Sequence, residues 1–177
     1  ILFGSIEMVI DGVSGSERSL QSLGILYKII IASGDIFALL VAVSILVFLF
    51  RRIFLHVRRF EGIEMKKISP IDAKIALTLI LLLMVSLMGM NASYVQMKNL
   101  TGEPMAGVFP VSHYFAPLLA GMEIQKLRTW HEIFWWSHIL LIFLFANILP
   151  YSKHFHVFMS VPNVLLARLD PLGKLPN

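Results

Sequence analysis

Three long runs of apolar residues set the pattern of the chain. They cover residues 23–50, 71–95 and 128–150, with few charged positions inside them. About 20 predominantly apolar residues are enough for a helix to cross the hydrocarbon core of a bilayer. The pattern therefore predicts an all-α membrane protein, a transmembrane helical bundle with three complete spans.

Shorter apolar pieces flank these runs. Residues 1–10 are too short to cross and carry Glu7, so they fit either an interfacial segment or the end of a truncated helix. The truncated N-terminal helix is the preferred interpretation, because the sequence opens without a methionine inside an apolar segment. Residues 11–22 predict a polar connection rich in Gly and Ser, and residues 114–120 a short re-entrant or interfacial turn.

Basic residues gather in one loop and in the tail. Residues 51–74 hold seven Lys or Arg against three Asp or Glu, and residues 151–177 hold three against one. Short basic loops stay on the cytoplasmic side of a membrane. We therefore predict a protein integral to a bacterial or archaeal cytoplasmic membrane, with its C-terminus in the cytoplasm. Residues 161–169 could lie on that surface as an amphipathic helix with Pro162 near its first turn.

Composition supports a membrane location and narrows the chemistry. The chain is 57% hydrophobic and only 15% charged, well outside the usual range of soluble domains. Its formal charge of +4 lies mostly in one loop and the tail, a placement that orients a membrane protein. We therefore expect lipid as a partner and no nucleic acid. The absence of cysteine excludes disulfides, thiolate-held iron–sulfur clusters and c-type haem attachment within this sequence. A metal held by this chain must therefore be held by His or carboxylate.

Four of the six histidines lie within residues 130–158. His138 stands inside the third apolar run and His156 follows 18 residues later. On a continuous helix this step is five turns and roughly 27 Å, which places both imidazoles on one face near opposite edges of the bilayer core. The spacing predicts two axial ligands for stacked b haems. His154 would face the other side, although a bend at Pro150 would change this geometry.

Other polar residues remain candidates with more than one role. Lys153 could neutralise a haem propionate or quinone headgroup, or snorkel to the interface. His131 could hydrogen-bond a quinone, gate a proton or lie at the interface, and His113 fits a structural or solvent-facing role better than a ligand. Asp35 fits an interfacial carboxylate paired with Lys28, or else a carboxylate in a proton path or quinone site.

The last helix resembles a known family. Residues 138–164, HILLIFLFANILPYSKHFHVFMSVPNV, look like the final transmembrane helix of the respiratory nitrate reductase gamma subunit family. The resemblance implies that His138 and His156 hold b haems and that residues 150–153 match the intervening motif. The chain is closer still to the cytochrome b membrane domain fused to, or partnered with, heterodisulfide-reductase-like iron–sulfur proteins, in the patterns WW-x-H, YSKH-x-H and D-P-x-G.

The same resemblance leaves the number of haems open. In the nitrate reductase relatives the partner ligands lie on an earlier helix, whose outer end would correspond to residues 1–10, and no histidine occurs there. One haem or two are therefore possible, with His138 unpaired or paired to His131 or His113. A haem on His156, with its second ligand upstream of Ile1, is the better supported of the two.

These observations predict a membrane-anchoring cytochrome b-type subunit that transfers electrons between membrane quinone and a cytoplasmic iron–sulfur oxidoreductase. Residues 1–158 would form the transmembrane domain, and residues 159–177 a tail or linker toward the iron–sulfur partner. Iron–sulfur clusters would lie only on that partner or on a fused domain, within a complex of other respiratory subunits. The alternative is a haem-free membrane anchor or assembly subunit whose histidines serve only packing.

Overall fold

The computed structural model describes residues 2–16, 18–55, 68–152 and 155–167. The elements follow in the order α1 (Leu2–Ser14), η1 (Ser19–Leu23), α2 (Ile25–Phe54), α3 (Ile68–Thr101), α4 (Ser112–Phe115), η3 (Ala116–Leu119), α5 (Ile124–Ile148), η4 (Leu149–Tyr151) and α6 (Phe155–Leu165). Throughout these ranges the chain forms helices and loops and no strand. Three helices, α2, α3 and α5, are long and apolar enough to cross a membrane, which confirms the predicted all-α bundle with three spans.

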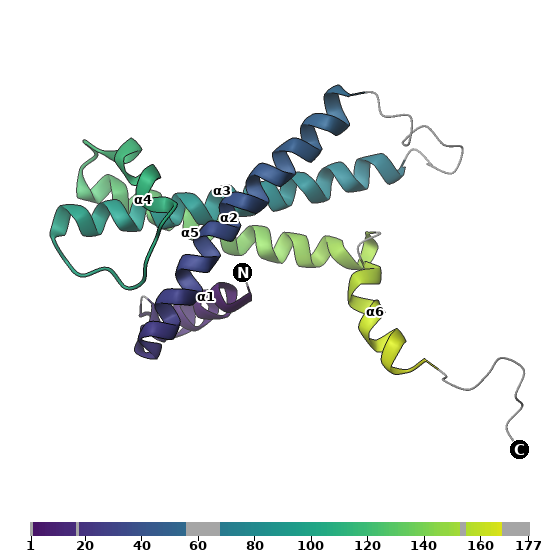
Figure 1. Cartoon of the computed structure of the whole chain (residues 1–177), viewed down its shortest axis with the longest axis horizontal. Coiled ribbons are helices and arrows are strands. Elements are labelled where there is room, and N and C mark those ends of the chain that lie inside the picture. The colour runs from purple at the N-terminus through teal and green to yellow at the C-terminus, as the bar shows by residue number, and fades with distance from the viewer. Residues whose placement is uncertain (1, 17, 56–67, 153–154, 168–177) are drawn as a thin grey trace, which may run out of the picture.

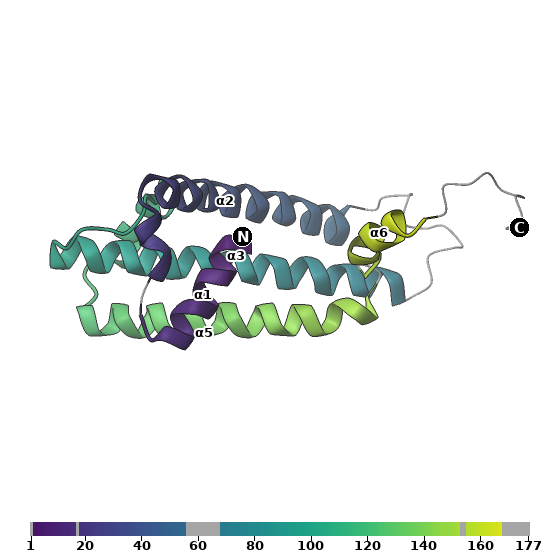
Figure 2. The ribbon, with the colours of Figure 1, turned by 90° about the horizontal axis from the view of Figure 1, so that it is seen from below.

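Helix α3 is the centre of the bundle (Figures 1 and 2). It runs between α2 on one side and α5 on the other. In its most apolar stretch 44% of the residues are buried, against 22% for α2 and 6% for α5. The core joins all three helices, because Ala38 and Ala42 of α2 meet Met84 of α3, and Leu141 and Ile142 of α5 pack against the same cluster. Alanines allow close approach of helices where lipid replaces water around them.

Helix α1 crosses one face of this layer (Figure 2). Its Gly12 lies against the indole of Trp135 on α5, with 3.4 Å between the ring and the place a Cβ would occupy. Asp11 fixes the turn that follows, since its carboxylate accepts the backbone N–H groups of Arg18 and Ser19, each at 2.8 Å. Helix α1 ends at Ser14, so it extends four residues into the predicted polar connection.

Residues 102–123, between α3 and α5, cover one end of the bundle and are called the covering segment below. The predicted short apolar turn at residues 114–120 falls on α4 and η3, which lie against α3 and do not cross. Tyr94 and Val95 of α3 form a second apolar cluster there with Phe109 and Ala116. This packing holds the segment down on the helices.

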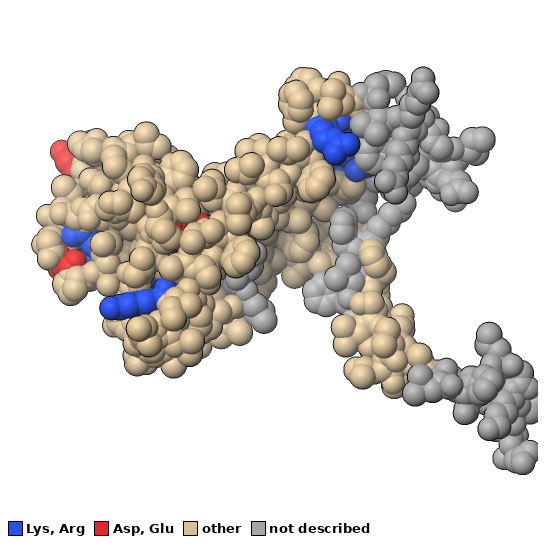
Figure 3. All heavy atoms as spheres, viewed as in Figure 1, with Lys and Arg blue, Asp and Glu red and all other residues tan. Residues whose placement is uncertain are grey.

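Charged side chains stand at the two ends of the long axis in Figure 3, and the stretch between them is almost free of charge. Arg51 and Arg52 close α2 at the end where α3 begins and where α5 finishes (Figures 1 and 2). At the opposite end Lys98 pairs with Glu103 in the loop after α3, and this hydrogen bond lowers the pKa of Glu103. The up-down-up arrangement agrees with a basic loop and a C-terminal tail on one side.

The C-terminal helix differs from the expected one. The spacing of His138 and His156 assumes a continuous helix, and this assumption is wrong. Helix α5 ends at Ile148, and α6 turns away from it (Figure 1). The break falls at Pro150, which has no N–H to donate to the helical ladder. The predicted surface helix over residues 161–169 is shifted as well, since α6 already begins at Phe155 and holds Pro162 in its interior.

Close packing of α3 on α5 gives a first testable prediction. A methyl group at Gly89 would lie 2.7 Å from the ring tip of Phe134, so Gly89→Ala must push that ring aside. We expect a loss of about 1–3 kcal/mol in unfolding free energy, the usual cost of overpacking. Gly34→Ala on α2 is the matched control, because nothing lies within 4 Å of its added methyl group. Unfolding in mixed micelles measures both, and equal stability of the two variants would contradict the packing.

Candidate functional site

A cavity of about 350 Å³ opens between α1, α2, α3 and α5. This volume lies in the range of small-molecule sites. The polar side chains on its wall come from all four helices: Glu7 from α1, Asp35 from α2, Asn91 from α3, and His131, Glu132 and His138 from α5. Ionisable groups at membrane depth are costly and are retained where they serve a function. The cavity is therefore the candidate site.

His138 is buried on the α5 side of the cavity with one ring nitrogen engaged. Its Nδ1 lies 3.0 Å from the backbone oxygen of Leu83 and 2.9 Å from the hydroxyl of Ser86, both on α3. The Ser86 hydroxyl also donates to the Leu83 oxygen. A carbonyl can only accept, so Nδ1 carries the hydrogen and donates it there. This tautomer leaves the Nε2 lone pair for a ligand, the arrangement typical of metal-bound histidine.

Asp35 holds the covering segment onto the bundle. Its Oδ2 accepts the backbone N–H groups of Val111 at 2.7 Å and Ser112 at 2.9 Å, at the start of α4. Its Oδ1 accepts the Ser112 hydroxyl and a longer hydrogen bond from Asn91. The predicted ion pair with Lys28 is wrong, because the carboxylate is only 1% exposed and its described partners are all on the covering segment and α3.

The α1 side of the cavity carries an acid, a phenol and a cation. Glu7 is 5% exposed and shares a hydrogen bond with Tyr27. Burial raises the pKa of Glu7, which lies outside the three candidate spans, and the hydrogen bond to Tyr27 opposes this only in part. Arg18 donates to the Tyr27 hydroxyl at 3.2 Å and stacks on the rings of Tyr94 and Phe109.

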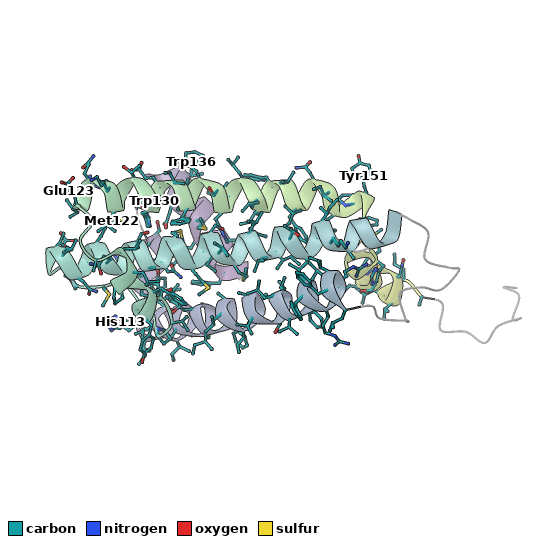
Figure 4. All side chains as sticks on the ribbon, turned by 90° about the horizontal axis from the view of Figure 1, so that it is seen from above. His113, Met122, Glu123, Trp130, Trp136 and Tyr151 are labelled. Carbon is teal, nitrogen blue, oxygen red and sulfur yellow. The ribbon has the colours of Figure 1, made fainter. Side chains whose placement is uncertain are left out.

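The structure divides the residues proposed from the sequence. His131, His138 and Asp35 line the cavity together, and the His131 ring lies beside Tyr94. His113 is exposed on α4, on the opposite side of the helical layer from Trp136 (Figure 4). His156 is exposed on α6, away from the cavity wall. Lys153 and His154 lie outside the described residues.

Sequence reasoning missed much of this wall. In the sequence Glu7 argues only against a span. Asn91 on the wall and Ser86 beside His138 are polar positions inside the second apolar run, and the sequence assigns them no role. Arg18 and Tyr94 carried no signal. A polar residue inside an apolar helix is itself a sign of a buried site, and that rule could have found Ser86 and Asn91.

The donor set limits the cofactors that the cavity could take. Within the described ranges no three His, Asp or Glu side chains gather as a metal cluster would need. A haem iron needs only axial imidazoles, and the free Nε2 of buried His138 fits one of them. The wall offers no second histidine facing it, since His131 lies seven residues earlier on the same helix. The residues present fit one axial ligand.

Fold and cavity together define a helical membrane protein with a polar site between its spans, and its relatives are oxidoreductases. The chain is 26% identical, over 99% of its length, to a Bacillus subtilis protein described as a probable iron-sulfur-binding oxidoreductase FadF. Over 35% of its length it is 32% identical to an EtfAB:quinone oxidoreductase of Syntrophomonas wolfei. It spans 23% and 9% of these two proteins. No family model and no solved structure matches.

The three candidate spans support the membrane character expected from the sequence, and both relatives are named as oxidoreductases. The likeness to the nitrate reductase gamma subunit family stays a prediction, because no family model matches.

Proposed function

We propose that this chain is a membrane-anchoring cytochrome b-type unit that passes electrons between membrane quinone and an iron–sulfur oxidoreductase, fused or separate. The observation that carries the proposal is His138, buried at membrane depth with Nδ1 fixed and Nε2 left for a ligand. A bound b haem would supply an iron that takes up and releases single electrons. The two relatives, one named for quinone and one for iron–sulfur binding, support the choice of partners.

The residues around His138 would orient the ligand and keep water away from it. The Leu83 carbonyl holds the imidazole in one tautomer, and Ser86 shares that contact. Hydrogen bonds of this kind fix the ring plane and raise the basicity of the ligating nitrogen. Ala38, Ala42 and the neighbouring core close the interior beside it.

The structure changes the order of preference between the two proposed haem ligands. From the sequence His156 is the better supported, whereas here His138 is buried beside a cavity and His156 is exposed on a separate helix. We therefore assign the first haem to His138 and keep His156 as a ligand for a second. Lys153 stays proposed to neutralise a haem propionate or a quinone headgroup. The proposed boundary between the membrane domain at residues 1–158 and the tail falls inside α6.

A haem-free membrane anchor is the second candidate. The contacts of His138 with Ser86 and Leu83 would also satisfy a histidine that only joins α3 to α5. In that case the chain would hold a quinone oxidoreductase at the membrane and carry no electrons itself.

The reduced-minus-oxidised visible spectrum of the purified full-length protein separates these two functions. We expect a b-type α band that appears on addition of a quinol or of a reduced iron–sulfur partner. A folded protein that lacks the band after expression with ample haem would end the cytochrome proposal and leave the anchor.

A further inference from the structure

Glu7 is the polar group of the cavity whose hydrogen bonding is incomplete. Its side chain is 95% buried, and among the described residues its Oε1 is the one buried side-chain oxygen or nitrogen with no hydrogen-bond partner. A buried acceptor without a hydrogen bond costs about 1–3 kcal/mol. Since Glu7 lines the cavity, a ligand with a hydrogen-bond donor would remove that cost.

The nearest cation is already engaged elsewhere. The guanidinium of Arg18 lies 4.1 Å from the centre of the Tyr94 ring and 4.8 Å from that of Phe109. It also donates to the Tyr27 hydroxyl. The donor that Glu7 lacks therefore has to come from a ligand. A neutral hydroxyl supplies it without adding a charge to a wall that already holds Arg18 beside Glu7, Asp11, Asp35 and Glu132.

The wall around Glu7 suits a flat ring. Gly4 leaves the α1 side of the cavity open, because no atom lies within 4 Å of a Cβ placed there. Gly12 lets the Trp135 indole lie close against α1. The aromatic side chains of Phe3 and Trp135 border the same space. Ligand sites of this kind combine apolar and aromatic walls with a few placed polar groups.

We propose that the free oxygen of Glu7 accepts a hydrogen bond from the hydroxyl of an aromatic ring held beside Trp135, the ring being the reduced quinone of the proposed function. This inference rests on that function for the identity of the ring, and on the cavity and Glu7 for the site. The neutral form of the same carboxyl can donate to the carbonyl of the oxidised ring. Burial of Glu7 raises its pKa and brings that neutral form within reach.

The test is a comparison of two ligands that differ only in whether the ring oxygen carries a hydrogen or a methyl group. 1-Naphthol carries the hydroxyl donor, 1-methoxynaphthalene lacks it, and neither is a quinone. Equilibrium dialysis of the full-length protein in nanodiscs, corrected with empty nanodiscs, gives both dissociation constants. We expect naphthol to bind about tenfold more tightly, the ratio that one satisfied buried acceptor supports.

Two variants locate the preference. Glu7→Leu removes the acceptor with little change of volume and is expected to bring the two ligands to equal affinity. Glu123→Leu is the matched control, because Glu123 is an exposed carboxylate that does not line the cavity. It should keep the tenfold ratio. Equal binding of both ligands to the unchanged protein, or a ratio that survives Glu7→Leu, overturns the proposal.

Haem content measured on the same preparation keeps this result distinct from the proposed function. A haem band with no preference for naphthol would refute the Glu7 site and leave the cytochrome proposal unaffected. A preference for naphthol without any haem band would support the site and end the cytochrome. In a preparation that does contain haem, naphthol binding confined to the haem-free fraction overturns the site, because the ring would then only be filling the place of the haem.

Discussion

Replacing His138 with alanine is expected to abolish the b-type band assigned to this site while the helical bundle still folds. The variant loses the Nε2 ligand, but the Leu83 carbonyl keeps a donor in the Ser86 hydroxyl at 2.9 Å. No buried backbone acceptor of α3 is therefore left unpaired. The band is measured in reduced-minus-oxidised spectra, and folding by circular dichroism of the same sample.

Three further samples sharpen this result. Imidazole added to His138→Ala should restore part of the band, since it refills the space of the lost ring and supplies the same nitrogen. Ser86→Ala should retain haem with a weakened hold, about 10–100-fold lower affinity by analogy with other residues that orient metal ligands. His113→Ala, at an exposed histidine on α4, should leave the spectrum unchanged. A full band in His138→Ala would refute the assignment.

Asp35→Ala is expected to cost roughly 3–5 kcal/mol of stability and to release the segment between α3 and α5. It leaves the N–H groups of Val111 and Ser112 and the Ser112 hydroxyl without their acceptor. Each orphaned donor costs about 1–3 kcal/mol when buried. Unfolding in mixed micelles measures the stability, and limited proteolysis within residues 102–123 measures the release.

Two controls separate this capping role from a simple loss of charge. Asp35→Asn keeps one carbonyl oxygen for the two backbone donors, so we expect a loss well below that of alanine. Lys28→Ala tests the ion pair suggested by the sequence, and it should change neither stability nor proteolysis. If Lys28→Ala proved as harmful as Asp35→Ala, the capping role would be refuted.

The main features of the fold were predictable because lipid imposes a simple rule. A helix that crosses the bilayer must be long and apolar, and the three runs at residues 23–50, 71–95 and 128–150 state this directly. The end of α5 was harder to place. Pro150 was recognised as a weak point, but a proline can either kink a helix or end it, and the sequence does not say which.

The site was predictable only in part. His138 stands out because a histidine inside an apolar run has few explanations, and His131 and Asp35 stand out for the same reason. The partners of these residues depend on how helices are placed in space. Ser86 reaches His138 from 52 positions away, and Ser112 reaches Asp35 from 77 positions away. No local pattern carries such pairings. The sequence favours His156 over His138 because the resemblance places no partner histidine opposite His138, and the spacing that joins the two assumes an unbroken helix.

The turn after Ile148 has a mechanical consequence for whatever follows the bundle. Helix α6 departs at a steep angle from α5 and carries exposed apolar side chains, among them Val161, Val164 and Leu165. Helices with a large exposed apolar surface bind in the headgroup region of a membrane. Under the proposed function, α6 would lie in that region and fix the depth of the spans. An iron–sulfur partner attached beyond α6 would then be held close to the membrane surface, at a short distance for electron transfer.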